Sequence, residues 1–139
     1  MANISEVMTK DVVSFPSTAT VVEAALAMRG ADIGYVLMTT EDQPRGVITD
    51  RDIVVRVIAE GLDPSETTLG DIASGELVCL TPEHTAEDAA RLMRQLAVRR
   101  LPVVDDRDRL VGVVAIGDLA VENDPESALA DISASPPNE

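Results

Sequence analysis

The stretch GVITDRDI at residues 46–53 decides the fold, because a related stretch, GVVAIGDL, returns at residues 112–119. Upstream of each copy, DVVSFPSTATVVEAALAMRG (11–30) aligns with ELVCLTPEHTAEDAARLMRQ (76–95), so the similarity extends over most of both halves. Segments that recur in this way indicate an internal duplication. A single repeat of about sixty residues cannot bury both its sheet and its helices, so we expect the two repeats to pack against each other.

Each repeat predicts the order strand, helix, strand, strand, helix. The first helix begins with a capping box, Thr20-x-x-Glu23 in one repeat and its shorter relative Thr85-x-x-Asp88 in the other. Two short strands joined by a polar turn follow, and they lead into the last helix. The expected strands are 12–15, 35–39 and 45–49 in the first repeat and 78–80, 101–104 and 110–115 in the second, with last helices at 50–60 and from near residue 118. This pattern predicts an α+β fold.

The chain divides into four predicted segments. Repeat 1 covers residues 1–61, a linker covers 62–69, repeat 2 covers 70–121, and an acidic flexible tail covers 122–139. Five acidic residues and no basic residue lie in that tail. We therefore expect the tail to lie outside the fold.

The charge balance excludes several classes of function. The chain has 11 basic and 25 acidic residues, a net charge of −14, and residues 1–121 alone carry −9. A general nucleic-acid-binding surface must be positive, and so must a surface that binds anionic membranes by charge. Only Phe15 and Tyr35 are aromatic, which argues against a surface that stacks bases in a row. We expect no nucleic-acid partner and no membrane partner.

Cysteine and histidine usage points to a reduced compartment and away from catalysis. Cys79 is the single cysteine, His84 is the single histidine, and no nucleophile–base pair or Walker-type loop is present. Cys79 alternates with apolar residues of a short strand and is expected to be buried or half-buried, while His84 is expected to be solvated in a turn. No signal core or stretch of about 20 apolar residues is present. We expect a cytoplasmic protein that is not an enzyme, with no catalytic residues, no metal site and no required cofactor.

The motifs GVITDRD (46–52), GVVAIGD (112–118) and VRRLPVVD (98–105) resemble those of the cystathionine-β-synthase (CBS) domain family. The resemblance covers residues 4 to about 121 and implies tandem CBS repeats, each β-α-β-β-α, packed pseudo-symmetrically in a disk-like homodimer. The sequence GLDP (61–64) and the short length are similar to stand-alone bacterial CBS pairs of the hypoxic-response type. The family implies a regulatory module with ligand clefts between its two repeats, often for AMP, ADP, ATP or S-adenosylmethionine.

The first implied ligand site contains the stronger motif. Thr49 would offer a hydroxyl at a helix start, where free N–H groups can face a phosphate, and Asp52 would accept hydrogen bonds from the ribose hydroxyls. Arg51 would add charge-assisted contacts. By the family's pattern, the complete set is Ile48, Thr49, Arg51, Asp52, Ser74, Val78, Val98, Arg99 and Arg100.

The second implied ligand site is weaker. Asp118 keeps the position of the ribose carboxylate, but Ala115 replaces the hydroxyl, and Gly34 with Tyr35 replaces the arginine pair of the first site. A nucleoside or an uncharged ligand still fits this chemistry, and so does an empty site. The family's pattern gives the set Thr9, Val13, Ile33, Gly34, Val114 and Asp118.

Three alternatives stay open. Thr49-x-x-Asp52 is also the pattern of an ordinary helix N-cap, and Arg99 with Arg100 can instead pair with the abundant acidic residues. The chain can also be a dimeric protein-interaction module with vestigial clefts and an unknown protein partner.

Helices 20–30 and 50–60 are apolar on more than one face, which predicts a homodimer through them and their repeat-2 equivalents.

Overall fold

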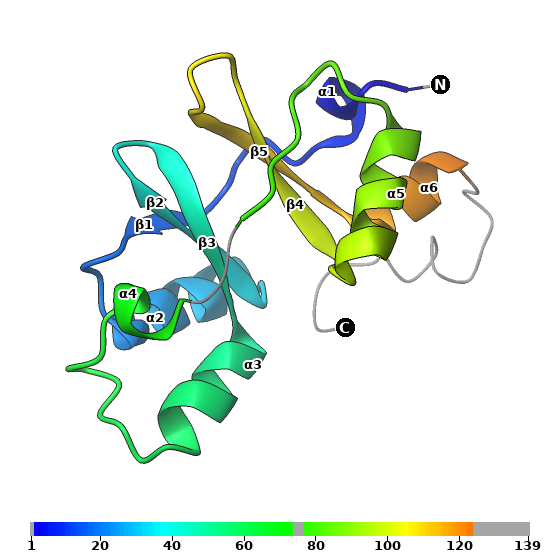
Figure 1. Ribbon diagram of the computed structural model, residues 1–139. Helices are drawn as coiled ribbons and strands as arrows, with labels where there is room; N and C mark the ends of the chain where they lie inside the picture. Colours follow the sequence, from blue (N-terminus) through cyan, green and yellow to red (C-terminus); the bar gives the residue numbers. More distant parts are fainter. Residues whose placement is uncertain (1, 74–76, 124–139) are drawn as a thin grey trace. The chain divides into compact units, whose positions relative to one another are not determined.

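Two small β-sheets, each with its own helices, form two separate units in the computed structural model (Figure 1). The structure describes residues 2–73 and 77–123, without the side chains of 121–123. Residues 13–77 form one unit, called here the middle unit, and residues 1–12 join the chain from residue 78 onward in the other, called the split unit. The α+β class is therefore as the sequence predicts.

The middle unit is built on a three-stranded sheet in the order β1-β2-β3. The strand β1 pairs parallel with β2 after the crossover helix α2, and β2 pairs antiparallel with β3. The buried core contains Val36, Ile48, Val57 and Leu69, all fully inaccessible to solvent. In chain order the elements are β1 (Ser14–Pro16), α2 (Val21–Ala31), β2 (Tyr35–Thr40), β3 (Gln43–Thr49), α3 (Asp50–Ile53), η1 (Val54–Ile58) and α4 (Leu69–Ile72).

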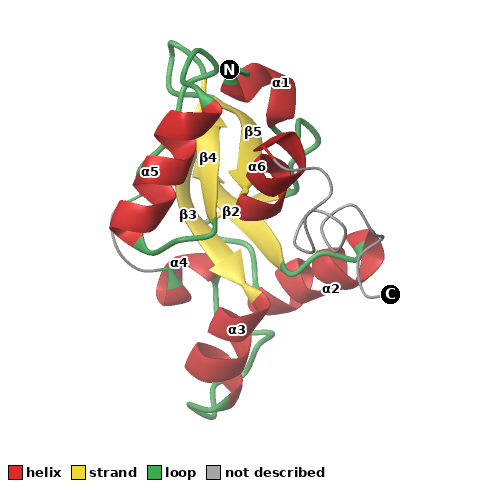
Figure 2. Ribbon diagram, turned by 90° about the vertical axis from the view of Figure 1, so that its right-hand side faces the viewer, coloured by secondary structure: helices red, strands yellow, loops and turns green. Residues whose placement is uncertain are grey.

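The split unit is built on an antiparallel pair, β4 and β5. Helix α5 packs beside β4 and α6 packs beside β5 (Figure 2). The short helix α1 contacts both α5 and α6, and Ile4 of α1 is fully buried. The elements are α1 (Ile4–Val7), α5 (Ala86–Leu96), β4 (Arg100–Val104), β5 (Leu110–Ala115) and α6 (Ile116–Asn123).

Local geometry repeats between the two units. Helices α2 and α5 both have 11 residues, and both begin with the predicted capping box. Both end at a residue in the left-handed region, Asp32 with φ 58° and Ala97 with φ 55°. The register of the hairpin also shifts at equivalent places, after Met38 in one unit and after Val103 in the other. The structure therefore confirms both capping boxes and the duplicated pattern of elements.

Several predicted elements differ in extent. The expected strand 78–80 is reduced to one parallel bridge, Leu80 to Val103, and α6 begins at Ile116, earlier than predicted. The expected single helix 50–60 consists of two segments, the α-helical α3 followed by the π-helical η1. In the π-helical segment, the Ala59 N–H donates to the Val54 carbonyl, five residues earlier, at 2.9 Å. A run of β-branched residues crowds the regular α-helix here and disfavours it.

The short helices α1 and α4 exchange places between the units. Helix α1 belongs to the predicted repeat 1, yet it packs in the split unit, where the Ile4 N–H donates to the His84 carbonyl at 2.8 Å. Helix α4 lies where the predicted linker meets repeat 2, yet Leu69 is buried in the core of the middle unit, and the Leu69 N–H donates to the Ala19 carbonyl at 2.9 Å. The units thus divide the chain differently from the repeat boundaries, which remain a prediction from the duplicated sequence.

The segment 62–69, predicted as a linker, is folded into the middle unit. The backbone N–H and the hydroxyl of Thr67 both donate to the Asp63 carbonyl, and Thr67 is buried. The Ser65 hydroxyl and backbone N–H donate to the Asp63 carboxylate, and these bonds lower the pKa of Asp63. The turn places Leu69 at the start of α4. The predicted tail lies outside the described residues from 124 onward.

Candidate functional site

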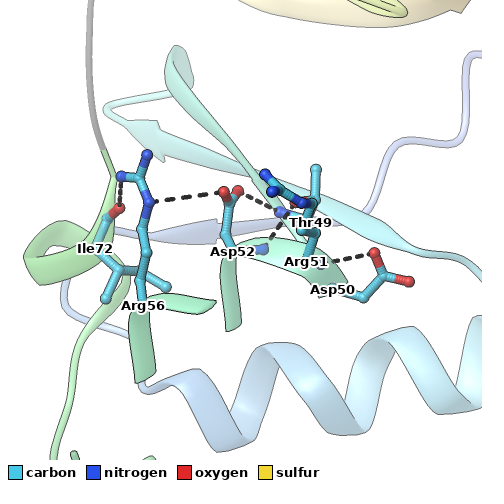
Figure 3. Close-up of polar contacts among 6 residues, drawn as sticks. All are labelled: Thr49, Asp50, Arg51, Asp52, Arg56 and Ile72. Atoms are coloured by element: carbon cyan, nitrogen blue, oxygen red, sulfur yellow. Dashed lines mark hydrogen bonds and ion pairs between the residues drawn. The ribbon is translucent and has the colours of Figure 1, made fainter. Parts of the chain in front are cut away.

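The motif Thr49-x-x-Asp52 forms a reciprocal capping box where β3 meets α3 (Figure 3). The Asp52 N–H donates to Thr49 Oγ1 at 3.1 Å, and the Thr49 N–H donates to Asp52 Oδ2 at 2.9 Å. Thr49 has the extended backbone, φ −105° and ψ 164°, that an N-cap residue adopts. The capping interpretation of the motif is therefore confirmed.

The two carboxylate oxygens of Asp52 have different surroundings. Oδ2 accepts the capping hydrogen bond, whereas Oδ1 lies 3.9 Å from Nε of Arg56. The Asp52 side chain keeps 27% of its surface exposed. Because an ionised carboxylate offers about four acceptor positions, Asp52 retains capacity for further donors.

Other polar groups surround the start of α3. The Asp50 N–H donates to the Gly34 carbonyl at 2.9 Å, and the Arg51 N–H donates to Asp50 Oδ1 at 2.8 Å. The Arg51 residue is exposed. Sequence reasoning missed Arg56, although its spacing of four residues from Asp52 on a helix is a recognisable signal for an ion pair.

The remaining predicted residues of the first site are dispersed. Ile48 is fully buried in the core of the middle unit, so its side chain does not offer a surface to a ligand. Val78 and Val98, each 38% exposed, belong to the split unit with Arg99 and Arg100. Ser74 lies outside the described residues. The structure brings together Thr49, Arg51 and Asp52, and their association with the split-unit residues stays a prediction.

The second predicted site has a cap that lacks the hydroxyl. Asp118 Oδ2 accepts the Ala115 N–H at 2.8 Å, but Ala115 has no hydroxyl to accept a bond in return. Burial raises the pKa of Asp118, and the Ala115 N–H bond partly opposes that change. Both acids thus accept a backbone N–H, but only Asp52 has a hydroxyl that accepts from its own N–H.

The other predicted members of the second site lie in both units. Val114 is fully buried in the core of the split unit, and Thr9 exchanges two backbone hydrogen bonds with Val113. Val13, Ile33 and Gly34 belong to the middle unit. The combined site therefore also stays a prediction.

Cys79 and His84 both have structural surroundings. Cys79 is half-buried, as expected, and burial together with the negative charge of Asp108 raises the pKa of its thiol. His84, expected to be solvated in a turn, is partly exposed there, and its Nδ1 accepts the Thr81 N–H at 2.9 Å. Histidine caps the turn here because the ring nitrogen substitutes for a backbone acceptor. Within residues 2–73 and 77–123, no three His, Cys, Asp or Glu residues are grouped to hold a metal ion.

Family membership follows from this duplicated fold and its motifs. Residues 4–59 and 69–122 each match the model of the CBS domain. The chain therefore belongs to the CBS domain family and is a tandem pair of these domains.

Known relatives place the chain among stand-alone members of that family. The CBS domain-containing protein YhcV of Bacillus subtilis is 39% identical over 137 residues, which cover 96% of each chain. Hypoxic response protein 1 of Mycobacterium tuberculosis is 33% identical over 130 residues, which cover 93% of this chain and 90% of that protein. A third relative, MK0525 of Methanopyrus kandleri, is 37% identical over 118 residues, 84% of this chain, and the match spans 60% of its length. The matches to the first two proteins span nearly their whole length.

Solved structures of similar proteins include a nucleotide complex and an oligomer. Hypoxic response protein I, solved with two coordinated zinc ions, has a TM-score of 0.78 and 32% identity, covering 88% of this chain and 99% of that one. The CBS domain protein PAE2072 of Pyrobaculum aerophilum, complexed with AMP, has a TM-score of 0.78 and 30% identity, covering 93% and 98%. The hexameric CBS-CP12 protein of bloom-forming cyanobacteria has a TM-score of 0.76 and 28% identity, covering 95% and 79%. In the described part of this chain, no helix is long and apolar enough to cross a membrane.

Proposed function

We propose that the chain is a regulatory module that binds an adenine nucleotide or adenosyl ligand, with Asp52 as the ribose-binding group. The observation that carries the proposal is the state of the Asp52 carboxylate, which is held by the cap through Oδ2 and remains partly exposed. A carboxylate with one fixed oxygen presents its remaining acceptor positions in a defined direction. Two adjacent hydroxyl donors, as on a ribose, match that arrangement. The AMP complex of PAE2072 supports an adenine nucleotide as the ligand class.

The surrounding groups suit the rest of such a ligand. Arg51 is exposed beside Asp52 and supplies a guanidinium for charge-assisted bonds to phosphate. In the family's pattern, Arg99 and Arg100 add charge to the same phosphate, and the exposed side chains of Val78 and Val98 supply apolar contact for the base. The site would then be a local cationic region on a strongly acidic protein.

We further propose that the Asp52 site is the functional one of the two. Its cap has both a hydroxyl and a carboxylate, and Arg51 lies beside it. Asp118 lacks the reciprocal hydroxyl, and burial raises the pKa of its carboxyl.

Isothermal titration calorimetry with AMP, ADP, ATP and S-adenosylmethionine tests the proposal. At least one ligand should bind, and Asp52→Asn should weaken that ligand by about 10- to 150-fold, because a hydrogen bond to a charged group contributes roughly 1.5–3 kcal/mol. Asp118→Asn is the matched control, because it makes the same change at the equivalent position and should leave that affinity within about twofold. Asparagine keeps an oxygen that can accept the capping bond, so both variants should fold. The absence of heat from all four ligands with folded wild-type protein would contradict the proposal.

Self-association of the chain through α2 and the α3–η1 region is the second part of the proposal. Four large apolar side chains on these helices are exposed: Leu26 at 50%, Val54 at 58%, Val55 at 45% and Ile58 at 59%. Exposed apolar residues that cluster on helices are typical of an interface. The hexameric CBS-CP12 protein supports self-association within the family.

The same exposed side chains favour the alternative function, a dimeric protein-interaction module whose clefts are vestigial. Analytical ultracentrifugation of wild type and Ile58→Glu tests the interface, because a carboxylate in place of Ile58 should convert a dimer to a monomer. A wild-type monomer at high concentration would contradict self-association. A dimer that binds none of the four nucleotides would favour the interaction module over the sensor.

A further inference from the structure

Arg56 connects the Asp52 carboxylate to a distant part of the middle unit. Its Nη1 donates to the backbone carbonyl of Ile72 at 2.9 Å, while its Nε lies 3.9 Å from Asp52 Oδ1 (Figure 3). Ile72 is the last residue of α4 and is 5% exposed, so the acceptor belongs to the packed core. The guanidinium therefore lies between the candidate ligand site and the end of α4.

The geometry makes Arg56 an orienting group and not only a surface ion pair. An arginine that pairs with a carboxylate alone loses much side-chain entropy for little gain. Here the bond to the Ile72 carbonyl already fixes the guanidinium, because carbonyls at a helix C-terminus have no intrahelical partner and accept side-chain donors. The positive charge therefore stays in one place beside Asp52 Oδ1.

We propose that Arg56 is a positioning residue that orients the Asp52 carboxylate for the two ribose hydroxyls of the ligand. This inference rests on the proposed function. The capping bond from the Thr49 N–H holds Oδ2, and the charge of Arg56 holds Oδ1 from the other side, so that the carboxylate plane is fixed at both oxygens. Ribose recognition benefits because a bidentate acceptor must have one orientation before the ligand arrives.

The proposal predicts an effect on the ribose alone. Removing Arg56 should weaken ligands that contain the 2′ and 3′ hydroxyls and should spare ligands that lack them. A residue that merely stabilises the fold would change both ligand types equally. A residue that contacts phosphate, as proposed for Arg51, would also change both equally, since both ligand types contain the phosphate.

The experiment is calorimetry with AMP and 2′,3′-dideoxy-AMP on wild type, Arg56→Met, Arg56→Lys and Arg51→Met. Wild type should bind AMP more tightly than the dideoxy ligand. Arg56→Met should weaken AMP by roughly two- to fivefold, the range of an exposed ion pair, with the dideoxy affinity unchanged. Arg56→Lys should restore part of the AMP affinity, because it keeps the charge while losing the planar guanidinium. Arg51→Met is the matched control and should weaken both ligands by the same factor.

The outcomes separate the two proposals. If wild type binds neither ligand, or binds AMP without preference over the dideoxy ligand, the proposed ribose site fails and the role of Arg56 fails with it. If wild type prefers AMP but Arg56→Met keeps the same preference, or weakens both ligands alike, only the role of Arg56 is overturned. Unfolding midpoints establish that each variant is folded, and Arg56→Lys alone decides the question if Arg56→Met does not fold.

Discussion

Truncation of Ile4 should destabilise the split unit, although Ile4 belongs to the predicted repeat 1. Its side chain is fully buried in the core that contains Leu80, Ala89 and Met93. Ile4→Ala removes three buried carbons at about 0.8 kcal/mol each, and the remaining cavity adds to that loss. We expect a loss of about 3 kcal/mol, within the range of roughly 2–5 kcal/mol for such core truncations.

Amide hydrogen exchange shows where that loss appears. The Val104 N–H donates to the Leu80 carbonyl at 2.8 Å in the split unit, and the Leu37 N–H donates to the Val13 carbonyl at 3.0 Å in the middle unit. Ile4→Ala should accelerate exchange at Val104 by about 100-fold, since 1.4 kcal/mol corresponds to tenfold, and should leave Leu37 nearly unchanged. Leu69→Ala, the equivalent truncation in the middle unit, should do the reverse. Equal acceleration at both amides in either variant, or a loss below about 1 kcal/mol for Ile4→Ala, would refute the assignment of α1 to the split unit's core.

Four further predictions concern stability measured by chemical denaturation. Thr85→Ala removes the hydroxyl of a capping box and should cost about 1 kcal/mol, whereas the exposed Thr18→Ala should change stability by less than about 0.5 kcal/mol. Gly112→Ala places a methyl group 2.6 Å from a methionine sulfur and 2.9 Å from a backbone oxygen, so it should cost about 1–3 kcal/mol. Gly30→Ala, on α2 with no atom within 4 Å of the new methyl group, should instead stabilise by up to about 1 kcal/mol. Burial raises the pKa of Asp118 above 3.8, so the folded protein holds a proton on this carboxyl more strongly than the unfolded chain does. Wild type should therefore gain stability relative to Asp118→Asn as the pH falls from 7 through the raised pKa, with no further relative gain below 3.8. A difference between the two proteins that does not change with pH would contradict this prediction.

Local signals in the sequence predicted the elements that depend on neighbouring residues. The capping boxes at Thr20 and Thr85 follow from a hydroxyl and a carboxylate three residues apart, and both form as expected. The Thr49–Asp52 pair obeys the same rule, which is why its capping role was also visible. Short-range hydrogen bonds of this kind need no knowledge of the tertiary fold.

Features that depend on distant contacts could not be predicted in the same way. Helices α1 and α4 have four residues each, too few to show a periodic apolar pattern, so nothing in the sequence indicated that they exchange units. The spacing of Arg56 from Asp52 was visible, but its bond to Ile72, sixteen residues away, was not. Ile48 is the last residue but one of β3, and its side chain points into the core. The alternation of side chains along this strand already indicated that Ile48 does not face a ligand.

The two acidic motif residues, Asp52 and Asp118, have different surroundings although they are equivalent in sequence. Asp52 and Asp118 occupy matching places in the two repeats, yet Asp118 is buried enough to raise its pKa. The replacement of a threonine by Ala115 was readable from the sequence, whereas the degree of burial was not. The sequence ranked the two candidate sites, and that ranking stays a prediction.

The exchange of α1 and α4 has a consequence for synthesis on the ribosome. The middle unit needs only residues 13–77, so it can close soon after that stretch emerges. Ile4 leaves the exit tunnel before the middle unit does, but its core partners extend to Leu119. At about 5–20 residues per second, the segment around Ile4 waits on the order of ten seconds with its apolar side chains unburied. Nascent chains therefore bury this segment only after the middle unit has closed, and chains arrested before Leu119 should expose it to chaperones and proteases.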